Sequence, residues 1–139
     1  MRRDIVVSVD DSEPDFRLVE MALKESGTSV RLYRVTDGEE AIAFLGRLGE
    51  FEHAPRPDLI LLDISMPKRN GFEVLQYLKS KDSLRSIPVV IFTSSSNPLE
   101  KRRALAMGAD QFISKPSDLD QFIEDVQTTC ARHLKITMP

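Results

Sequence analysis

Residues 57–67 read Pro57-Asp58-Leu59-Ile60-Leu61-Leu62-Asp63-Ile64-Ser65-Met66-Pro67. The centre of this stretch is a continuous apolar run, residues 59–62, which ends at Asp63. A short apolar run between prolines is typical of a strand that is buried on both faces, as in a parallel sheet. Open α/β sheets bind their ligands at the carboxyl edge, where a residue at the end of this strand would emerge. We therefore expect Asp63 to be the centre of a functional site.

On both sides of this run the chain alternates between strand-like and helix-like segments. The other expected strands are residues 5–9, 30–35, 89–92 and 111–114, and a helix-like segment follows each strand. Alternation of this kind is typical of βαβ units, which form a parallel sheet with helices on both faces. The sequence therefore predicts an α/β fold with a five-stranded, doubly wound parallel sheet.

The length and composition of the chain limit the classes of protein to consider. A chain of 139 residues fits a single domain spanning 1–139, with a core of about residues 4–134 and a short C-terminal tail. The apolar runs are far shorter than the ~20 residues of a membrane helix, and the charged N-terminus does not resemble a signal peptide. The net charge of −3 argues against a nucleic-acid partner, and the single cysteine, Cys130, excludes an intramolecular disulfide. We expect a cytoplasmic protein with no membrane partner.

Polar residues follow four of the expected strands. Asp10 and Asp11 come after the first, Asp63 after the third, Thr93 ends the fourth, and Lys115 follows the fifth. Because the carboxyl ends of parallel strands meet at one edge of a sheet, these residues should converge although they are distant in sequence.

The expected cluster has the chemistry of a phosphoryl-transfer site. Three neighbouring carboxylates, those of Asp10, Asp11 and Asp63, repel each other unless a cation neutralises them, and Mg²⁺ is the natural candidate for oxygen ligands beside phosphate. Thr93 and Lys115 could hold the oxygens of a phosphoryl group. Asp63 would then be the nucleophile that accepts this group as an acyl phosphate. The first loop lacks the glycines of a phosphate-cradling loop, so nucleotide binding is not expected.

These residues also match a known family. The chain resembles the receiver domain of bacterial two-component response regulators over nearly its whole length, in Asp10-Asp11, Asp63, Met66-Pro67, Gly71, Thr93 and Lys115-Pro116. The resemblance implies a flavodoxin-like (βα)5 receiver fold. It also implies a signalling protein rather than an enzyme acting on external substrates, which accepts a phosphoryl group from a sensor histidine kinase.

The resemblance assigns a role to each metal-site residue. Asp63 is the expected phosphoacceptor and a ligand of Mg²⁺. Asp11 is expected to bind the cation directly, Asp10 through water, and Ser65 through its backbone carbonyl.

Further expectations concern the switch that reads out phosphorylation. Thr93 and Lys115 would contact the phosphoryl group, and movement of the Thr93 hydroxyl toward it would vacate space for the switch aromatic, Phe112. The surface formed by the fourth helix, the fifth strand and the fifth helix would then change shape. The resemblance also implies a cis peptide bond between Lys115 and Pro116.

Partners are expected from the same resemblance. The long polar linker at 49–57 and the segments 86–90 and 94–98 are similar to single-domain regulators that partner cyanobacterial phytochromes. A phytochrome-type kinase is therefore a candidate donor. No output domain is expected after Pro116, so output would come from a downstream phosphotransfer or effector protein, or from a homodimer.

Two alternatives stay open at this point. A pseudo-receiver would use the fold only as an interaction module, and it would normally lack parts of the acidic site. An aspartyl-phosphate hydrolase would typically carry a general acid two residues after its nucleophile, where this chain has Ser65. Taken singly, Thr93 and Lys115 could also be an ordinary strand-end hydroxyl and a solvated lysine.

Overall fold

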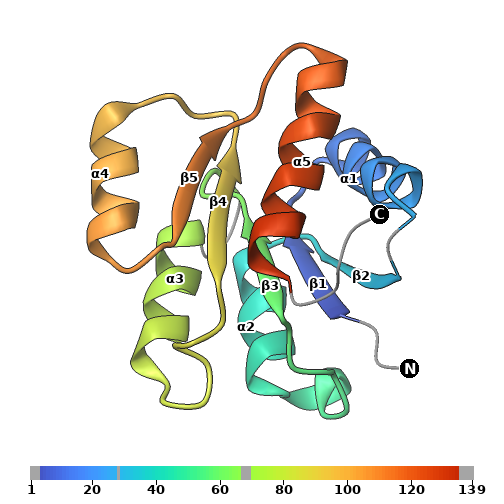
Figure 1. The fold of residues 1–139 in the computed structure, drawn as a ribbon. Coiled ribbons are helices and arrows are strands. Elements are labelled where there is room, and N and C mark those ends of the chain that lie inside the picture. The colour runs from blue at the N-terminus through green and yellow to red at the C-terminus, as the bar shows by residue number, and fades with distance from the viewer. Residues whose placement is uncertain (1–3, 28, 67–69, 135–139) are drawn as a thin grey trace.

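The computed structural model describes residues 4–27, 29–66 and 70–134. These residues form one sheet of five parallel strands in the order β2-β1-β3-β4-β5, which confirms the predicted fold class (Figure 1). The strands are β1 (Asp4–Val9), β2 (Val30–Val35), β3 (Leu59–Leu62), β4 (Val89–Thr93) and β5 (Gln111–Ser114). The helices are α1 (Glu13–Glu25), α2 (Gly38–Gly46), the short 3-10 helix η1 (Gly49–Phe51), α3 (Gly71–Ser80), α4 (Pro98–Ala106) and α5 (Leu119–His133).

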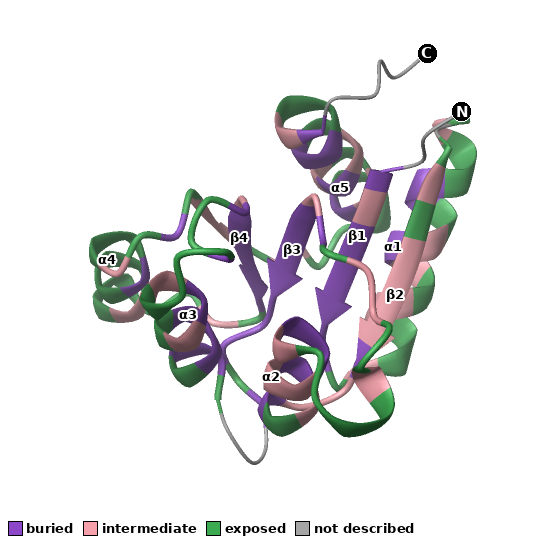
Figure 2. Cartoon of the chain, turned by 90° about the horizontal axis from the view of Figure 1, so that it is seen from below, coloured by how far each residue is buried: buried purple, intermediate pink, exposed green. Residues whose placement is uncertain are grey.

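The sheet separates two apolar clusters. Leu59 and Leu61 of β3 belong to the cluster that includes residues of α1 and α5, whereas Ile60 and Leu62 belong to the one that includes residues of α2, α3 and α4. This alternation follows from the geometry of a strand, in which successive side chains point to opposite faces. Strands β1, β3 and β4 are therefore almost wholly buried, while the edge strand β2 is partly exposed (Figure 2).

The α-helices begin at side-chain caps. At each N-cap, a side-chain oxygen accepts a hydrogen bond from a backbone N–H in the first turn; these residues are Ser12, Asp37, Asn70, Asn97 and Asp118. Such caps satisfy N–H groups that have no partner within the helix. Since the strands are parallel, the capped ends lie at the carboxyl edge of the sheet, beside the expected site. No described helix combines the length and the apolar character that crossing a bilayer requires.

The α2–β3 linker is more ordered than the sequence indicates. The polar composition of residues 49–57 indicates an irregular segment, but these residues include η1, whose Phe51 ring lies 5.5 Å from the Phe44 ring of α2. Apolar packing of this one aromatic residue holds a segment that is otherwise mostly polar.

Gly71 determines how closely α3 approaches the end of β3. A Cβ atom at this position would lie 2.5 Å from the backbone carbonyl oxygen of Asp63 and 2.5 Å from Cα of Ile64. Both atoms belong to the backbone, so neither could move aside by a change of rotamer. Glycine is therefore required where α3 begins against the strand that carries Asp63.

We expect Gly71→Ala to destabilise the fold by about 1–3 kcal/mol, the usual range for overpacking a buried site. The measurement is the free energy of unfolding from urea titration followed by circular dichroism. Gly46→Ala is the control, because the only contact below 3 Å there is with the Tyr77 hydroxyl, at the end of a side chain that can shift. Equal stability losses in the two variants would show that the close approach at Gly71 is unimportant.

Candidate functional site

The polar residues at the strand ends converge as the sequence predicts. Asp63 N–H donates to the Val9 carbonyl at 3.0 Å, and Lys115 N–H donates to the Thr93 carbonyl at 2.6 Å. These bonds extend the pairing of β3 with β1 and of β5 with β4 by one residue beyond the strands. The backbone that carries Asp63 and Lys115 is therefore fixed by the sheet itself.

Three carboxylates form the acidic part of the site. Ligand oxygens of Asp10, Asp11 and Asp63 all lie within 4.8 Å of one another. Asp10 and Asp63 are each only 5% exposed, whereas Asp11 lies at the surface. A group of carboxylate oxygens that opens to solvent on one side fits a hard divalent cation that keeps several of its waters.

The two oxygens of Asp63 have different surroundings. Oδ1 accepts hydrogen bonds from the Thr93 hydroxyl at 2.7 Å and from the Ser65 N–H at 2.9 Å. Oδ2 faces the Lys115 Nζ at 3.6 Å, beyond ordinary hydrogen-bond distance. Thr93 and Ser65 thus orient the carboxylate through one oxygen and leave the other available for a reaction.

Lys115 supplies the positive charge of the site. Its Nζ donates to Asp10 Oδ2 at 2.6 Å and to Asp15 Oδ2 at 2.8 Å. Burial lowers the pKa of Lys115, but the hydrogen bonds to Asp10 and Asp15 and the charges of Asp10 and Asp63 outweigh burial, so the pKa is raised. The ammonium group therefore stays charged at neutral pH.

Asp10 combines burial with the ion pair. Burial raises its pKa above the usual value, and the hydrogen bonds from Lys115 and from the Ser12 N–H offset only part of that effect. The same Ser12 N–H bond, 2.8 Å long, and the Lys115 bond occupy one oxygen each of the Asp10 carboxylate. Whether Asp10 reaches a cation through water, as the family resemblance implies, stays a prediction.

Asp15 is a site residue that sequence reasoning missed. It lies in the first turn of α1, where acidic residues are common because they interact favourably with the helix dipole. Nothing in the local sequence distinguishes that ordinary role from a contact with Lys115, which is 100 residues away in the chain.

The loop after β4 is tied to the neighbouring elements through Ser95. The Ser95 N–H donates to the Thr93 hydroxyl oxygen at 3.3 Å, and its own hydroxyl bonds to the Glu100 carboxylate of α4. The Ser114 hydroxyl of β5 donates to the Ser95 carbonyl at 2.9 Å. The position of the Thr93 hydroxyl is thereby linked to α4 and β5, through two residues, Glu100 and Ser114, that had not been predicted.

Phe112 lies on β5, beside this network rather than in the carboxylate cluster. It is half-buried and packs against the core cluster that includes residues of α2, α3 and α4.

Ser65 contributes its N–H to Asp63, while the metal-binding role of its carbonyl stays a prediction. Pro67, part of the motif after Asp63, lies outside the described residues.

One expectation drawn from the family resemblance is wrong. The described residues contain no cis peptide bond, so the bond between Lys115 and Pro116 is trans. The trans isomer of a bond before proline is favoured by only about 0.5–1 kcal/mol, so local surroundings decide which isomer is found. With the trans bond, Lys115 still bonds to Thr93 through its backbone and to Asp10 through its side chain.

Comparisons with known proteins agree with this geometry. The family profile described as "Response regulator receiver domain" matches residues 6–127. Response regulator Rcp1 of Synechocystis sp. (strain ATCC 27184 / PCC 6803 / Kazusa) is 38% identical over 123 residues, which cover 88% of this chain and 84% of Rcp1.

Solved structures of response regulators are also similar to this chain. The phosphorylated cyanobacterial phytochrome response regulator RcpA has a TM-score of 0.92 and 35% identity, with 99% of each chain covered. The Mn²⁺-bound form of Rcp1 has a TM-score of 0.90 and 36% identity, covering 98% of this chain and 99% of that one. The bacteriophytochrome response regulator RtBRR has a TM-score of 0.79 and 34% identity, covering 97% of this chain and 80% of that one. By sequence, fold and the arrangement of its strand-end residues, this chain belongs to the response regulator receiver family of two-component systems.

Proposed function

We propose that this chain, a single-domain response regulator of the Rcp1 type, accepts a phosphoryl group from a sensor histidine kinase on Asp63. In this proposal residues 1–139 act as one receiver domain in the cytoplasm. The observation that carries it is the asymmetric setting of Asp63, with Oδ1 held by Thr93 and Ser65 and Oδ2 facing Lys115. A carboxylate that served only as a turn former would not need both a buried hydroxyl donor and a nearby ammonium group.

The metal expected in this reaction is Mg²⁺. Asp10, Asp11, Asp63 and the Ser65 carbonyl would hold it, with Asp10 acting through water. When bound, the cation neutralises charge on the carboxylates and on the phosphoryl oxygens. The relative Rcp1 has been solved in a Mn²⁺-bound form, which supports a divalent cation as the cofactor of this chain.

In the chemical step, Asp63 Oδ2 attacks the phosphorus atom of a phosphohistidine in the kinase. The O–P bond forms as the P–N bond breaks, and the electron pair of that bond stays on the histidine nitrogen. Thr93 and Lys115 would hold the phosphoryl oxygens, as charge on them must be offset during transfer. The chain would thus catalyse its own phosphorylation and dephosphorylation without turning over an external substrate.

Readout of the phosphoryl group would begin at Thr93. The Thr93 hydroxyl now donates to Asp63, and Ser95 connects it to α4 and β5. If this hydroxyl turns to the phosphoryl oxygens, the Ser95 loop and Phe112 adjust, and the surface of α4, β5 and α5 changes shape. The exposed leucines on α4 and α5, which are Leu99, Leu105 and Leu119, support a partner at that surface.

The named relatives suggest which kinase and which outputs to test first. RcpA is a cyanobacterial phytochrome response regulator and RtBRR a bacteriophytochrome response regulator, so a phytochrome-type kinase is the proposed donor. A downstream phosphotransfer or effector protein, or a second copy of the chain, would receive the signal.

Incubation with acetyl phosphate and Mg²⁺ should add one phosphoryl group to the chain, measured by intact mass spectrometry. Asp63→Asn should abolish the addition, because an amide oxygen cannot form the acyl phosphate, and EDTA should abolish it as well. Asp82→Asn, which changes an exposed loop carboxylate, is the matched control and should leave it intact. An unmodified wild-type chain, even after rapid quenching, would favour the pseudo-receiver.

Asp11→Asn should weaken binding of Mn²⁺ at least about tenfold, which corresponds to about 1.4 kcal/mol. Asp11 is exposed, so the substitution removes a ligand charge without disturbing the core. Electron paramagnetic resonance of free Mn²⁺ gives the dissociation constant, and Asp120→Asn at the exposed start of α5 is the control. Identical affinities in both variants would remove Asp11 from the metal site.

A further inference from the structure

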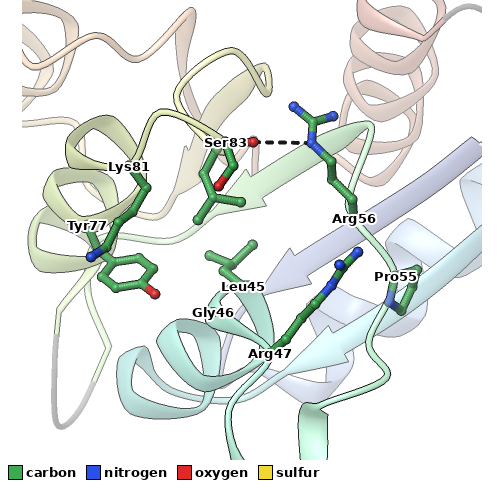
Figure 3. A pocket seen from close by; sticks show the side chains of 9 residues that line it. Leu45, Gly46, Arg47, Pro55, Arg56, Tyr77, Lys81 and Ser83 are labelled. Atoms are coloured by element: carbon green, nitrogen blue, oxygen red, sulfur yellow. Dashed lines mark hydrogen bonds between the residues drawn. The ribbon is translucent and has the colours of Figure 1, made fainter.

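A pocket of about 370 Å³ lies at the edge of the sheet opposite Asp63. The ends of α2 and α3 form it together with the linker before β3 and the loop after α3, and its lining residues are Leu45, Gly46, Arg47, Pro55, Arg56, Tyr77, Lys81, Ser83 and Leu84. Figure 3 shows Tyr77 and Lys81 on one side, Arg47, Arg56 and Pro55 on the other, and Leu45 between them. A volume above about 300 Å³ is within the usual range for small-ligand sites.

The charge of this pocket differs from that of the protein as a whole. Arg47, Arg56 and Lys81 line it and no carboxylate does, although the chain carries a net charge of −3. None of the three cations forms an ion pair with a carboxylate in the described part of the chain. Asp82, which follows Lys81 in the sequence, forms an ion pair with Arg85 at 3.1 Å instead.

The side chains of Arg47 and Arg56 are exposed, and each guanidinium group forms hydrogen bonds that leave other N–H groups without a partner among the described residues. Arg47 donates through Nε to the Ala54 carbonyl at 2.9 Å. Arg56 donates through Nε to the Ser83 carbonyl at 3.3 Å and through Nη2 to the Ser86 hydroxyl at 3.2 Å. Both Nη atoms of Arg47 and Nη1 of Arg56 have no partner among the described residues. Guanidinium groups oriented by such hydrogen bonds, with further N–H groups available, suit the oxygens of a carboxylate or phosphate.

Two backbone features also set the form of the pocket. Arg47 has φ 56° and ψ 47°, a left-handed conformation that glycine adopts far more readily, and no other described non-glycine residue has a positive φ. At Gly46, a Cβ atom would lie 2.4 Å from the Tyr77 hydroxyl oxygen. Position 47 thus carries an arginine although a glycine would adopt this backbone conformation with less strain. Position 46 carries a glycine, and any side chain there would displace the Tyr77 ring.

Cations near helix C-termini often serve only to bind the last helix carbonyls. The described contacts of Arg47 and Lys81 differ from that pattern. Arg47 Nε bonds to the linker, and Lys81 Nζ lies 5.3 Å from the centre of the Tyr77 ring. Capping of the C-termini of α2 and α3 therefore does not explain where the Arg47 and Lys81 side chains lie.

We propose that this pocket binds a small organic anion, with a carboxylate or phosphate group on an apolar body. The Nη groups of Arg47 and Arg56 bind the anionic group, and Leu45, Leu84 and the Tyr77 ring contact the apolar body. Helices that follow parallel strands run back toward the amino edge, so the ends of α2 and α3 lie away from the phosphoacceptor. The anion and the phosphoryl group can therefore be bound at the same time.

The test is a titration of the ¹⁵N-labelled full chain with phenyl phosphate, benzoate and neutral benzyl alcohol, in EDTA, followed by NMR. We expect saturable shifts centred on the amides of Gly46, Arg47, Ser83 and Leu84 with at least one anion, and none with benzyl alcohol. Which anion binds more tightly decides between phosphate and carboxylate. Asp63→Asn should bind equally well, which separates this result from the proposed phosphoacceptor function.

Substitutions of single arginines show which side chains bind the anion. Arg47→Gly keeps the left-handed backbone and should weaken binding at least tenfold while the chain stays folded, and Arg56→Gln should act in the same direction. Arg17→Gln, which removes an exposed charge from α1, is the control and should change binding less than twofold. No saturable shifts with either anion, shifts centred elsewhere, equal binding of benzyl alcohol, or unchanged affinity in Arg47→Gly would each overturn the proposal.

Discussion

The site depends on the ammonium group of Lys115, which lies between carboxylates from separate parts of the chain. Its bonds to Asp10 and Asp15 connect the end of β5 with β1 and α1, across the two strands that lie between β5 and β1. A buried carboxylate is strongly unfavourable unless a charge or a set of hydrogen bonds compensates it. Lys115 provides part of that compensation for Asp10, together with the Ser12 N–H, and at 3.6 Å it contributes to the compensation for Asp63. The carboxylates can therefore be buried side by side before any cation binds.

Two of the three N–H groups of the Lys115 ammonium are already used in short hydrogen bonds. Its two short bonds go to Asp10 and Asp15, whereas the proposed phosphorylation would call for a contact at Asp63. A bound cation would relieve Asp10 of its dependence on Lys115 and leave the ammonium group free to turn toward the phosphoryl oxygens. In this account Lys115 and Thr93 are the groups whose partners change, and Ser95 carries the change at Thr93 to α4 and β5.

Much of this arrangement can be predicted from the sequence, for a physical reason. The buried run at residues 59–62 and the alternation of strands and helices require a parallel sheet, and a parallel sheet brings Asp10, Asp63, Thr93 and Lys115 to one edge. Side-chain partners across long distances in the chain could not be predicted. Asp15 has the sequence context of an ordinary first-turn acid, and the pocket around Arg47 depends on a backbone angle with no sequence signature. Only a small energy difference separates the cis and trans isomers of the peptide bond before Pro116, so the cis isomer implied by the family resemblance was a wrong prediction.

Chemical identification of the phosphorylated side chain tests the central claim most directly. After phosphorylation by acetyl phosphate, borohydride reduces an aspartyl phosphate to homoserine, which tandem mass spectrometry locates in the sequence. We expect homoserine at position 63 and at no other aspartate, with none formed when Mg²⁺ is withheld. Homoserine at Asp10 or Asp11, or a phosphoryl group that resists borohydride because it is bound to a hydroxyl or a histidine, would contradict it.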